Sequence, residues 1–386
     1  MKRVVRTVSF CLFCLLICLT STQNIQAADE PSTYKIGGVF PLSGYLAWLG
    51  EYYKKGAELQ VDMINKAGGV KGHKLELIVY DDQSSPEQGA RVAQRLISKD
   101  GVIALIGTAS APISGALASV ANKSKVPLII SSGYEVNPAK EPYVFNTVHK
   151  TEFAVMVPFK YFQSKGIKKV ALLMPLGPLG ELGSKIAHAC ASEFEITIVG
   201  EEKFDTKTPD VTAQLAKIKA MEPQAIFSFV TGEPAALIAR NMDQINFKVP
   251  LLVSHGNATP GFLKLVSGLN TTILVPSGKI MKPEDISNDD RTKSLAVDFN
   301  RKHLERYGEP ANYFSAMLSD SVNLIALGLG NTDKPDPEKL RSAIEKISDF
   351  PALQGVYNMS PTEHHGTKLD DMILLTIKDG KWEMIK

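Results

Sequence analysis

The first strand-like segment of the chain reads YKIGGVFPLSG and covers residues 34–44. Its apolar part, Tyr34–Phe40, predicts a buried strand that ends at Pro41 and Gly44. A helix is predicted to follow as far as about residue 67. Its apolar residues recur at helical spacing on one face: Tyr53, Ala57, Val61 and Ile64.

From this unit outward, strand-like and helix-like segments alternate. Ser85-Pro86-Glu87 combines an N-cap, a first-turn proline and an early carboxylate, which predicts a helix start. Strands are predicted at 74–80, 102–106, 126–130, 143–148, 170–174, 195–199, 225–230, 250–254, 372–377 and 381–385. One helix is predicted to follow the strand at 102–106 and to end at residue 124. Further helices are predicted at 180–193, 210–221, 233–245, 289–307, 314–330 and 337–348. Asp379-Gly380 predicts a hairpin turn between the last two strands.

Regular alternation of this kind predicts parallel sheets with helices on both faces. The series falls into two parts of similar length, before and after Thr151, and 386 residues are enough for two domains. We therefore predict an α/β fold of two doubly wound parallel-sheet lobes. Ligands of such sheets bind outside the carboxyl ends of the strands, so the cleft between the lobes is the expected site.

Residues 1–27 have the layout of a secretory signal peptide. Lys2, Arg3 and Arg6 precede an uncharged apolar run, and a small residue, Ala27, stands at the expected cleavage point. The apolar run is shorter than the roughly 20 residues that a membrane-spanning helix needs, which argues against an anchor. Secretion into the periplasm is expected.

Cleavage would change both the charge and the cysteine content. The 43 basic residues fall to 40 without the three leader residues, against 41 acidic ones, so no basic surface indicates a nucleic-acid or membrane partner. Cys190 would be the one remaining cysteine, which permits neither an internal disulfide nor a cysteine-rich metal site. Lipid attachment at Cys18 is disfavoured because the preceding residue, Ile17, is not small.

Several segments together resemble one family. They are GVFPLSG at 38–44, GAE at 56–58, INKAGGVKG at 64–72, YDD at 80–82, IGT at 106–108, VPL at 126–128, and YNMSP at 357–361 followed by KDGKW at 378–382. Their order and spacing resemble the leucine/isoleucine/valine-binding proteins, which are type I periplasmic solute-binding proteins. The resemblance covers essentially the whole chain after the leader.

The resemblance implies two lobes joined by three crossovers. The first lobe would hold 32–148 and 278–353, and the second 149–277 and 354–386. The lobes would close on a small molecule by hinge bending. The family further implies delivery to an ABC permease in the inner membrane, and we expect a monomer without metal or cofactor.

Five site residues are expected in the first lobe. In amino-acid binders of the family, a serine four residues after the glycine matching Gly107 holds the ligand carboxylate; here that position is Ala111, with Ser110 before it. The resemblance also implies backbone contacts from Ser132 and Tyr134. Helix-end N–H groups after Gly107 favour a carboxylate in any case. Trp48 and Tyr134 are candidate aromatic walls, although Leu49 occupies the family's aromatic position.

Four residues are expected from the second lobe. Leu179 and Thr231 fall near positions that are aromatic in the family, and His255 stands where amino-acid binders carry the acid that holds the ligand ammonium. Histidine has no full negative charge, so it is a poor anchor for an ammonium. Glu233 is a candidate substitute acid or a helix-end residue. The pattern favours a carboxylate without an amine, or an amide such as urea, over a standard amino acid.

Other signals have plainer explanations. Gly177, Gly180 and Gly183 are spaced like a phosphate loop but lack its Lys-Ser/Thr pair, so we predict a strand-to-helix turn that faces the cleft. His364-His365 favours a structural loop over a metal site. No nucleophile motif supports an enzyme of the cell envelope. A ligand-sensing subunit that signals through a partner remains the alternative to transport.

Overall fold

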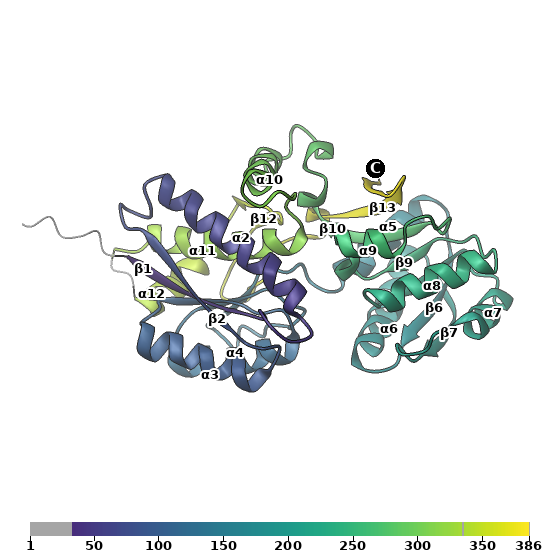
Figure 1. The fold of residues 1–386 in the computed structure, drawn as a ribbon, viewed down its shortest axis with the longest axis horizontal. Helices are drawn as coiled ribbons and strands as arrows, with labels where there is room; N and C mark the ends of the chain where they lie inside the picture. Colours follow the sequence, from purple (N-terminus) through teal and green to yellow (C-terminus); the bar gives the residue numbers. More distant parts are fainter. Residues whose placement is uncertain (1–32, 334–335, 386) are drawn as a thin grey trace, which may run out of the picture.

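The computed structural model describes residues 33–333 and 336–385, so the predicted leader lies outside the described residues. Figure 1 shows two lobes side by side along the long axis of the molecule. Each lobe contains one large β-sheet. Among the described residues, no helix combines the length and the apolar composition needed to cross a membrane.

The first lobe is built on a five-stranded sheet in the order β2-β1-β3-β4-β5, in which every neighbouring pair is parallel. Ile36, Val39 and Phe40 of β1 are fully buried, as expected of a strand covered on both faces. The five strands predicted before residue 151 are confirmed, with ends shifted by a few residues. They are β1 (Tyr34–Phe40), β2 (Leu75–Asp81), β3 (Ala104–Gly107), β4 (Leu128–Ile130) and β5 (Val144–Asn146).

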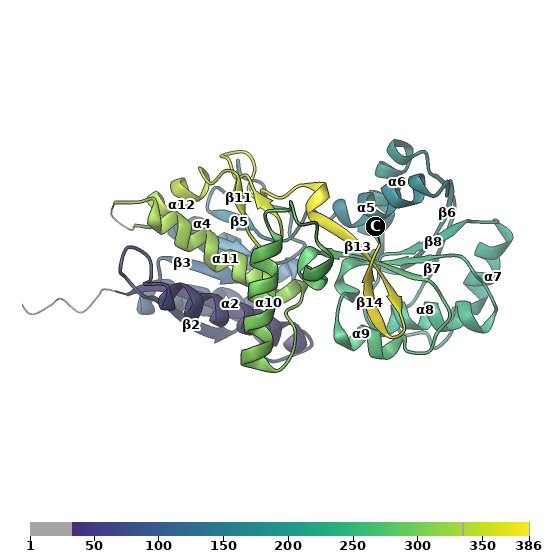
Figure 2. The same cartoon turned by 90° about the horizontal axis from the view of Figure 1, so that it is seen from above.

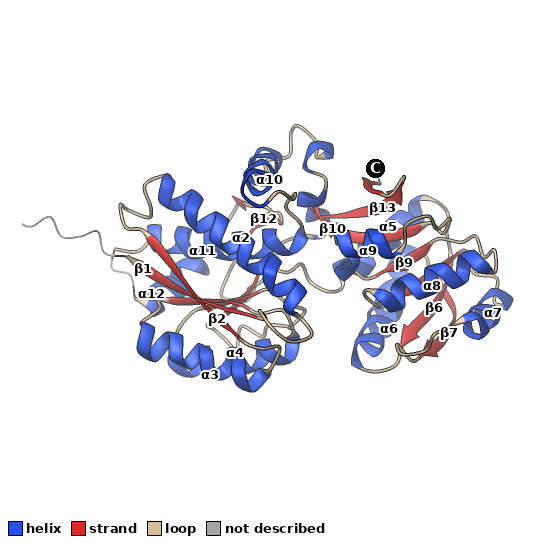
Figure 3. Cartoon of the chain, viewed as in Figure 1, coloured by secondary structure: helices blue, strands red, loops and turns tan. Residues whose placement is uncertain are grey.

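Helices cover both faces of this sheet (Figure 3). α2 packs with α11 on one face, and α3 packs with α4 on the other. Ser85 caps α3 as predicted, because its side chain accepts a hydrogen bond from the Gln88 N–H. The helices of this lobe are α2 (Ala47–Lys66), α3 (Pro86–Arg95), η1 (Leu96–Asp100), α4 (Ala111–Ser124), η4 (Lys279–Met281), η5 (Pro283–Asp285), α10 (Lys293–Tyr307), α11 (Tyr313–Gly330) and α12 (Pro337–Ile344).

The second lobe is built on a seven-stranded sheet in the order β14-β13-β10-β9-β8-β6-β7. Five neighbouring strands are parallel, in the sheet order β10-β9-β8-β6-β7. β13 is antiparallel to β10, and β14 is antiparallel to β13. β10 was not expected from the sequence, because Pro276 lacks the N–H group that a central strand uses. The strands are β6 (Lys169–Pro175), β7 (Thr197–Phe204), β8 (Ala225–Ser228), β9 (Leu251–Val253), β10 (Ile273–Gly278), β13 (Met372–Lys378) and β14 (Lys381–Met384).

In the second lobe, α5 and α6 pack on one face of the sheet, and α7, α8 and α9 on the other (Figure 2). The predicted hairpin is present: Asp379 and Gly380 both have positive φ angles, 50° and 71°, between β13 and β14. The helices are α5 (Phe153–Ser164), α6 (Pro178–Ala191), η2 (Ser192–Phe194), α7 (Thr212–Ala220), α8 (Glu233–Gln244), η3 (His255–Asn257), α9 (Pro260–Leu265) and η6 (Leu369–Asp371).

The chain passes between the lobes three times. It crosses after β5, crosses back after β10, and returns to the second sheet after the small β11–β12 pair (Phe350–Pro351 and Val356–Tyr357). The predicted three-crossover architecture is therefore confirmed. The residue numbers assigned above to the lobe boundaries remain predictions.

Buried hydrogen bonds join the crossover segments to each other. His149 Nε2 lies 2.8 Å from the carbonyl oxygen of Gln354, and His149 Nδ1 lies 3.1 Å from the hydroxyl of Tyr313. Because a carbonyl oxygen only accepts, Nε2 carries the proton and Nδ1 accepts from the phenol. Desolvation lowers the pKa of His149 to about 3, which keeps the imidazole neutral. The first and third crossovers are thus tied together.

Candidate functional site

A cavity of about 400 Å³ lies between the lobes, beyond the carboxyl ends of the strands of both sheets. Its position matches the cleft expected for this architecture, and its size suits a small organic molecule. Both lobes contribute to its lining: Leu46, Trp48, Leu49, Tyr53, Ala109, Ala111, Ser131, Ser132, Gly133, Val148, Thr151, Pro178, Leu179, Leu182, Phe229, Thr231, Ser254, His255, Gly256, Phe314 and Met317.

Asp81 holds the turn that carries the first part of this lining. Its carboxylate accepts hydrogen bonds from the N–H groups of Leu42 (2.8 Å) and Ser43 (3.1 Å) and from the Ser43 hydroxyl (2.6 Å). Burial alone would raise the pKa of Asp81, but these hydrogen bonds outweigh it and lower the pKa. The ionised carboxylate therefore braces the β1–α2 turn, which places Trp48 and Leu49 at the cavity.

The segment after β4 forms the adjoining wall and is also held from behind. Tyr53 donates its hydroxyl to the carbonyl oxygen of Ser131, and Ser132 Oγ lies 2.7 Å from Ser114 Oγ. The Asn146 amide donates to the carbonyl oxygens of Ser132 (2.9 Å) and Tyr134 (3.0 Å). Those two carbonyl groups are therefore engaged within the protein.

The first turns of α6 supply apolar side chains of the second lobe to the cavity lining. Its first turn lies against the end of β6, because a Cβ at Gly180 would stand 1.9 Å from the carbonyl oxygen of Pro175. A Cβ at Gly183 would stand 2.2 Å from the Cβ of Phe229. Glycine at both positions allows this close approach. The predicted strand-to-helix turn is confirmed, and it places Leu179 at the cavity.

His255 is the titratable group that the second lobe presents to the cavity. It begins η3, directly after β9, and its ring lies near those of Phe229 (6.1 Å between centroids) and Tyr313 (6.0 Å). Desolvation lowers the pKa of His255 to about 4, so the imidazole is neutral at pH 7. Its Nδ1 is buried and has no hydrogen-bond partner within the described residues. This nitrogen is available to a ligand.

Within the described part of the chain, the lining contains no aspartate, glutamate, lysine or arginine. Its polar groups are hydroxyl groups, backbone groups, the indole N–H of Trp48 and the neutral imidazole. Close by, Ser110 is the N-cap residue of α4, but its side chain caps no N–H group of the helix. Ser110 Oγ is buried and lacks a partner within the described residues. The start of α4 therefore offers uncapped N–H groups and a free hydroxyl, which together suit an anion.

Six of the nine residues expected from the sequence line this cavity: Trp48, Ala111, Ser132, Leu179, Thr231 and His255. Ser110, Tyr134 and Glu233 are not part of the lining. Tyr134 instead donates its hydroxyl to Glu141 (2.6 Å) beside Gly115. Glu233 is exposed and ion-paired with Arg240. In this structure both side chains therefore have local partners outside the lining.

Phe314 and Met317, which α11 contributes to the cavity, were not expected from the sequence. Phe314 lies edge-on to Trp48, with 5.8 Å between ring centroids. These residues follow Trp48 by more than 260 positions. Their helical spacing resembles that of any core face, so only packing of α11 against α2 brings them to the site.

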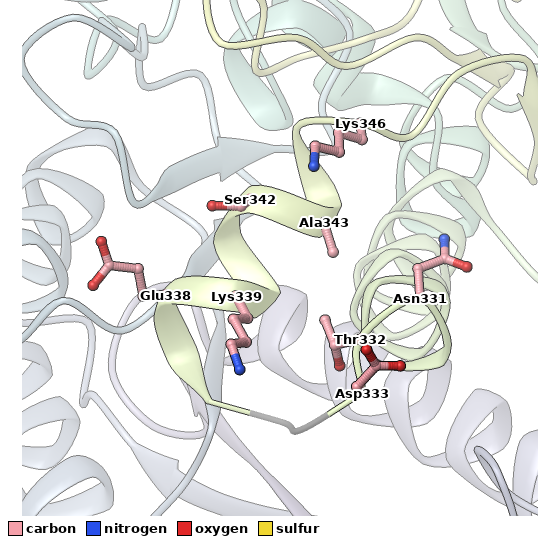
Figure 4. A pocket seen from close by; sticks show the side chains of 8 residues that line it. All are labelled: Asn331, Thr332, Asp333, Glu338, Lys339, Ser342, Ala343 and Lys346. Atoms are coloured by element: carbon pink, nitrogen blue, oxygen red, sulfur yellow. The ribbon is translucent and has the colours of Figure 1, made fainter.

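A second hollow, of about 480 Å³, lies between the end of α11 and α12 (Figure 4). Asn331, Asp333, Glu338 and Lys339 are among its lining residues, all from the first lobe. α12 lies at the end of that lobe that is distant from the second lobe (Figure 1). Closure of the two lobes would not enclose a ligand there.

A two-lobed α/β protein with a ligand-sized cleft at the carboxyl ends of both sheets has the architecture of a solute-binding protein. The family model described as periplasmic binding protein matches residues 33–381. The chain therefore belongs to this family, with the leucine/isoleucine/valine-binding proteins, and has the type I periplasmic binding protein fold.

Individual relatives agree with this assignment. Leu/Ile/Val-binding protein homolog 8 of Brucella melitensis is 41% identical over 380 residues, which are 95% of this chain and 92% of the relative. A leucine-, isoleucine-, valine-, threonine- and alanine-binding protein of Pseudomonas aeruginosa is 23% identical over 83% of each chain. A branched-chain amino acid transporter substrate-binding protein of Streptococcus pneumoniae, solved with isoleucine, has a TM-score of 0.77 at 25% identity over 92% of this chain and 99% of its own.

Proposed function

We propose that the chain is the ligand-capturing component of a periplasmic ABC importer of the branched-chain amino acid type, and that it catalyses no reaction. Family membership supports the transport role. The two-lobed fold with its interlobe cleft supports capture by closure. The leader at residues 1–27 supports secretion.

The ligand of this importer would be a small carboxylate with an apolar body and no α-amino group. One observation carries this proposal: the cavity lining contains no acidic side chain, and His255 faces it as a neutral imidazole. An ammonium group buried there would have no counter-charge, which is costly in a desolvated site. Phe229, Phe314 and Met317 would contact the apolar body.

The carboxylate of the ligand would bind at the start of α4. There the uncapped N–H groups of the first turn can donate to its oxygens. His255 would reach a second polar group of the ligand, a carbonyl or hydroxyl, from the other lobe. Contacts from both lobes would make the closed form the one that retains ligand.

Isothermal titration calorimetry on refolded, ligand-free protein tests the proposal with molecules that share an apolar side chain and differ in their polar groups. The set is leucine, 4-methylpentanoate, 4-methylpentanamide and 3-methylbutylamine, with phenylalanine and 3-phenylpropanoate as an aromatic pair. We expect the amine-free acid of at least one pair to bind with a Kd on the order of micromolar. Its amino acid should bind at least about tenfold more weakly, equivalent to about 1.4 kcal/mol.

Two results would overturn this ligand class. If leucine or phenylalanine bound as tightly as the matching acid, another group would hold the ammonium. If the amide bound as tightly as the acid, a carboxylate would not be what the site recognises, and the chain would be an amide binder.

A further inference from the structure

Exposed apolar side chains occur in the two strand-to-helix segments that supply Trp48 and Leu179 to the cavity. Among the described residues, seven large hydrophobic side chains are exposed, and four of them lie in the two turns that border the cavity. They are Tyr45 (72% exposed), Trp48 (47%), Leu176 (61%) and Leu179 (43%). Apolar groups gathered at one place on a protein surface commonly mark a contact.

The two pairs occupy equivalent places in the two lobes. Tyr45 and Trp48 stand three residues apart where β1 leads into α2, the first strand-to-helix turn of the first lobe. Leu176 and Leu179 stand three residues apart where β6 leads into α6, the corresponding turn of the second lobe. The inner member of each pair, Trp48 or Leu179, lines the shared cavity, and the outer member does not.

Both outer residues are carried by well-ordered turns. The N–H of Leu46, next to Tyr45, donates to Ser84 Oγ (3.1 Å), and the N–H of Leu176 donates to the carbonyl oxygen of Phe204 (2.8 Å). These hydrogen bonds hold the backbone of both turns, so little backbone ordering is needed when the side chains are covered.

We propose that Tyr45 and Leu176 are positioning residues that meet across the mouth when the lobes close, and so slow ligand release without touching the ligand. Trp48 and Leu179 already face one cavity from opposite lobes, so hinge closure moves their outer neighbours toward each other. Covering these side chains removes apolar surface from water, which favours the closed form. The proposal rests on lobe closure and not on the identity of the ligand.

Cross-linking tests the contact without any ligand. In the chain from residue 28 onward, Cys190→Ser removes the remaining thiol, and Tyr45→Cys with Leu176→Cys introduces one thiol on each lobe. A disulfide requires the two Cα atoms to come within about 4.4–6.8 Å. We expect rapid disulfide formation under mild oxidation, with a smaller radius of gyration in solution scattering than for the reduced protein.

The matched control is Leu304→Cys with Leu176→Cys. Leu304 is similarly exposed (49%), but it lies on α10, above the first lobe in Figure 1. Cross-linking of Tyr45→Cys/Leu176→Cys at least tenfold faster than this control supports the contact. A rate equal to the control would overturn it.

Release kinetics test the consequence. Trp382→Phe leaves Trp48, which lines the cavity, as the single tryptophan after the leader. Stopped-flow measurement of Trp48 fluorescence then follows the binding and release of 4-methylpentanoate. We expect Leu176→Ser and Tyr45→Ser to raise its dissociation rate constant three- to tenfold, and Leu295→Ser, an exposed control on α10, to leave it unchanged. An unchanged dissociation rate constant in both Leu176→Ser and Tyr45→Ser would overturn the proposed slowing of ligand release.

Failure of 4-methylpentanoate and 3-phenylpropanoate to bind the unmodified chain would count against the proposed ligand class instead, since cross-linking needs no ligand.

Discussion

The carboxyl group of Asp320 accepts a hydrogen bond from the hydroxyl of Tyr357 at 3.2 Å, and both side chains are fully buried. Asp320 lies within α11 of the first lobe, and Tyr357 ends β12 before the chain enters the second sheet. The same carboxyl group accepts from the N–H groups of Leu353 (2.9 Å) and Gln354 (2.8 Å). One buried side chain therefore anchors the third crossover to the first lobe.

Asp320 should give the protein a characteristic pH dependence. Burial raises its pKa to about 7, although the three hydrogen bonds oppose this increase. Between about pH 4 and pH 7 the folded state then holds a proton that the unfolded state has lost, so the free energy of unfolding falls as pH rises and levels off above pH 7. Asp320→Asn has no charge to bury. As the pH rises from 4 to 7, the free energy of unfolding of Asp320→Asn minus that of the natural chain should therefore increase by roughly 2–4 kcal/mol.

Urea unfolding of both proteins at several pH values measures this difference. Near pH 4, where Asp320 is protonated in the folded state and about half protonated in the unfolded state, Asp320→Asn should be the less stable of the two. Its amide group would donate toward an N–H that needs an acceptor. A stability difference that stayed constant from pH 4 to pH 7 would contradict the raised pKa.

His255 should contribute to affinity without making it pH-dependent above pH 5.5. Desolvation lowers its pKa to about 4, so its charge is unchanged between pH 5.5 and 8. We expect the Kd of an amine-free acid to vary less than about twofold in that range, and His255→Ala to weaken binding about tenfold or more. Calorimetry at four pH values checks both statements. Equal affinity of His255→Ala and the natural chain would remove His255 from the site.

Glu233 should be dispensable for ligand binding. Its carboxylate is exposed, pairs with Arg240 and is not part of the cavity lining. We expect Glu233→Gln to leave the Kd of any bound ligand within about twofold and to change stability by less than about 1 kcal/mol, as is usual for exposed ion pairs. Calorimetry and thermal unfolding measure the two quantities. A tenfold loss of affinity for an amine-bearing ligand would instead identify Glu233 as its counter-charge.

Gly183 should tolerate no side chain, because a Cβ there would stand 2.2 Å from that of Phe229. Gly183→Ala gains helix propensity of about 1 kcal/mol, but the clash should lower the free energy of unfolding by about 1–3 kcal/mol. The matched control is Gly261→Ala in α9, where the nearest atom, Thr259 Oγ1, is 3.8 Å away. Urea unfolding compares the two variants. Equal stability would show that α6 shifts without cost.

Most of the fold could be predicted from the sequence because local signals agreed with the tertiary structure. The apolar run of β1, the Ser85 cap and the Asp379-Gly380 turn each depend on neighbours within a few residues. β10 was missed for the same reason: Pro276 opposes a strand locally, and only pairing with β9 and β13 makes it one.

The candidate site divides in the same way. Trp48, Leu179 and His255 follow strand ends, and the strand-to-helix alternation with the resemblance to known binders was enough to select them. Tyr134 was expected at the site from the family resemblance and as an aromatic wall, and Glu233 as a substitute acid. Their side chains are held by Arg240 and Glu141, and an ion pair or hydrogen bond of that kind cannot be read from position alone.

The sequence by itself determined the two-lobed α/β class, the family and the position of the cleft, because periodicity, turn residues and spaced motifs are local properties. Only the tertiary structure decided that Phe314 meets Trp48 and that, of the residues it describes, none with a charged side chain lines the cavity. These relationships depend on how distant segments pack, and packing is a property of the whole chain.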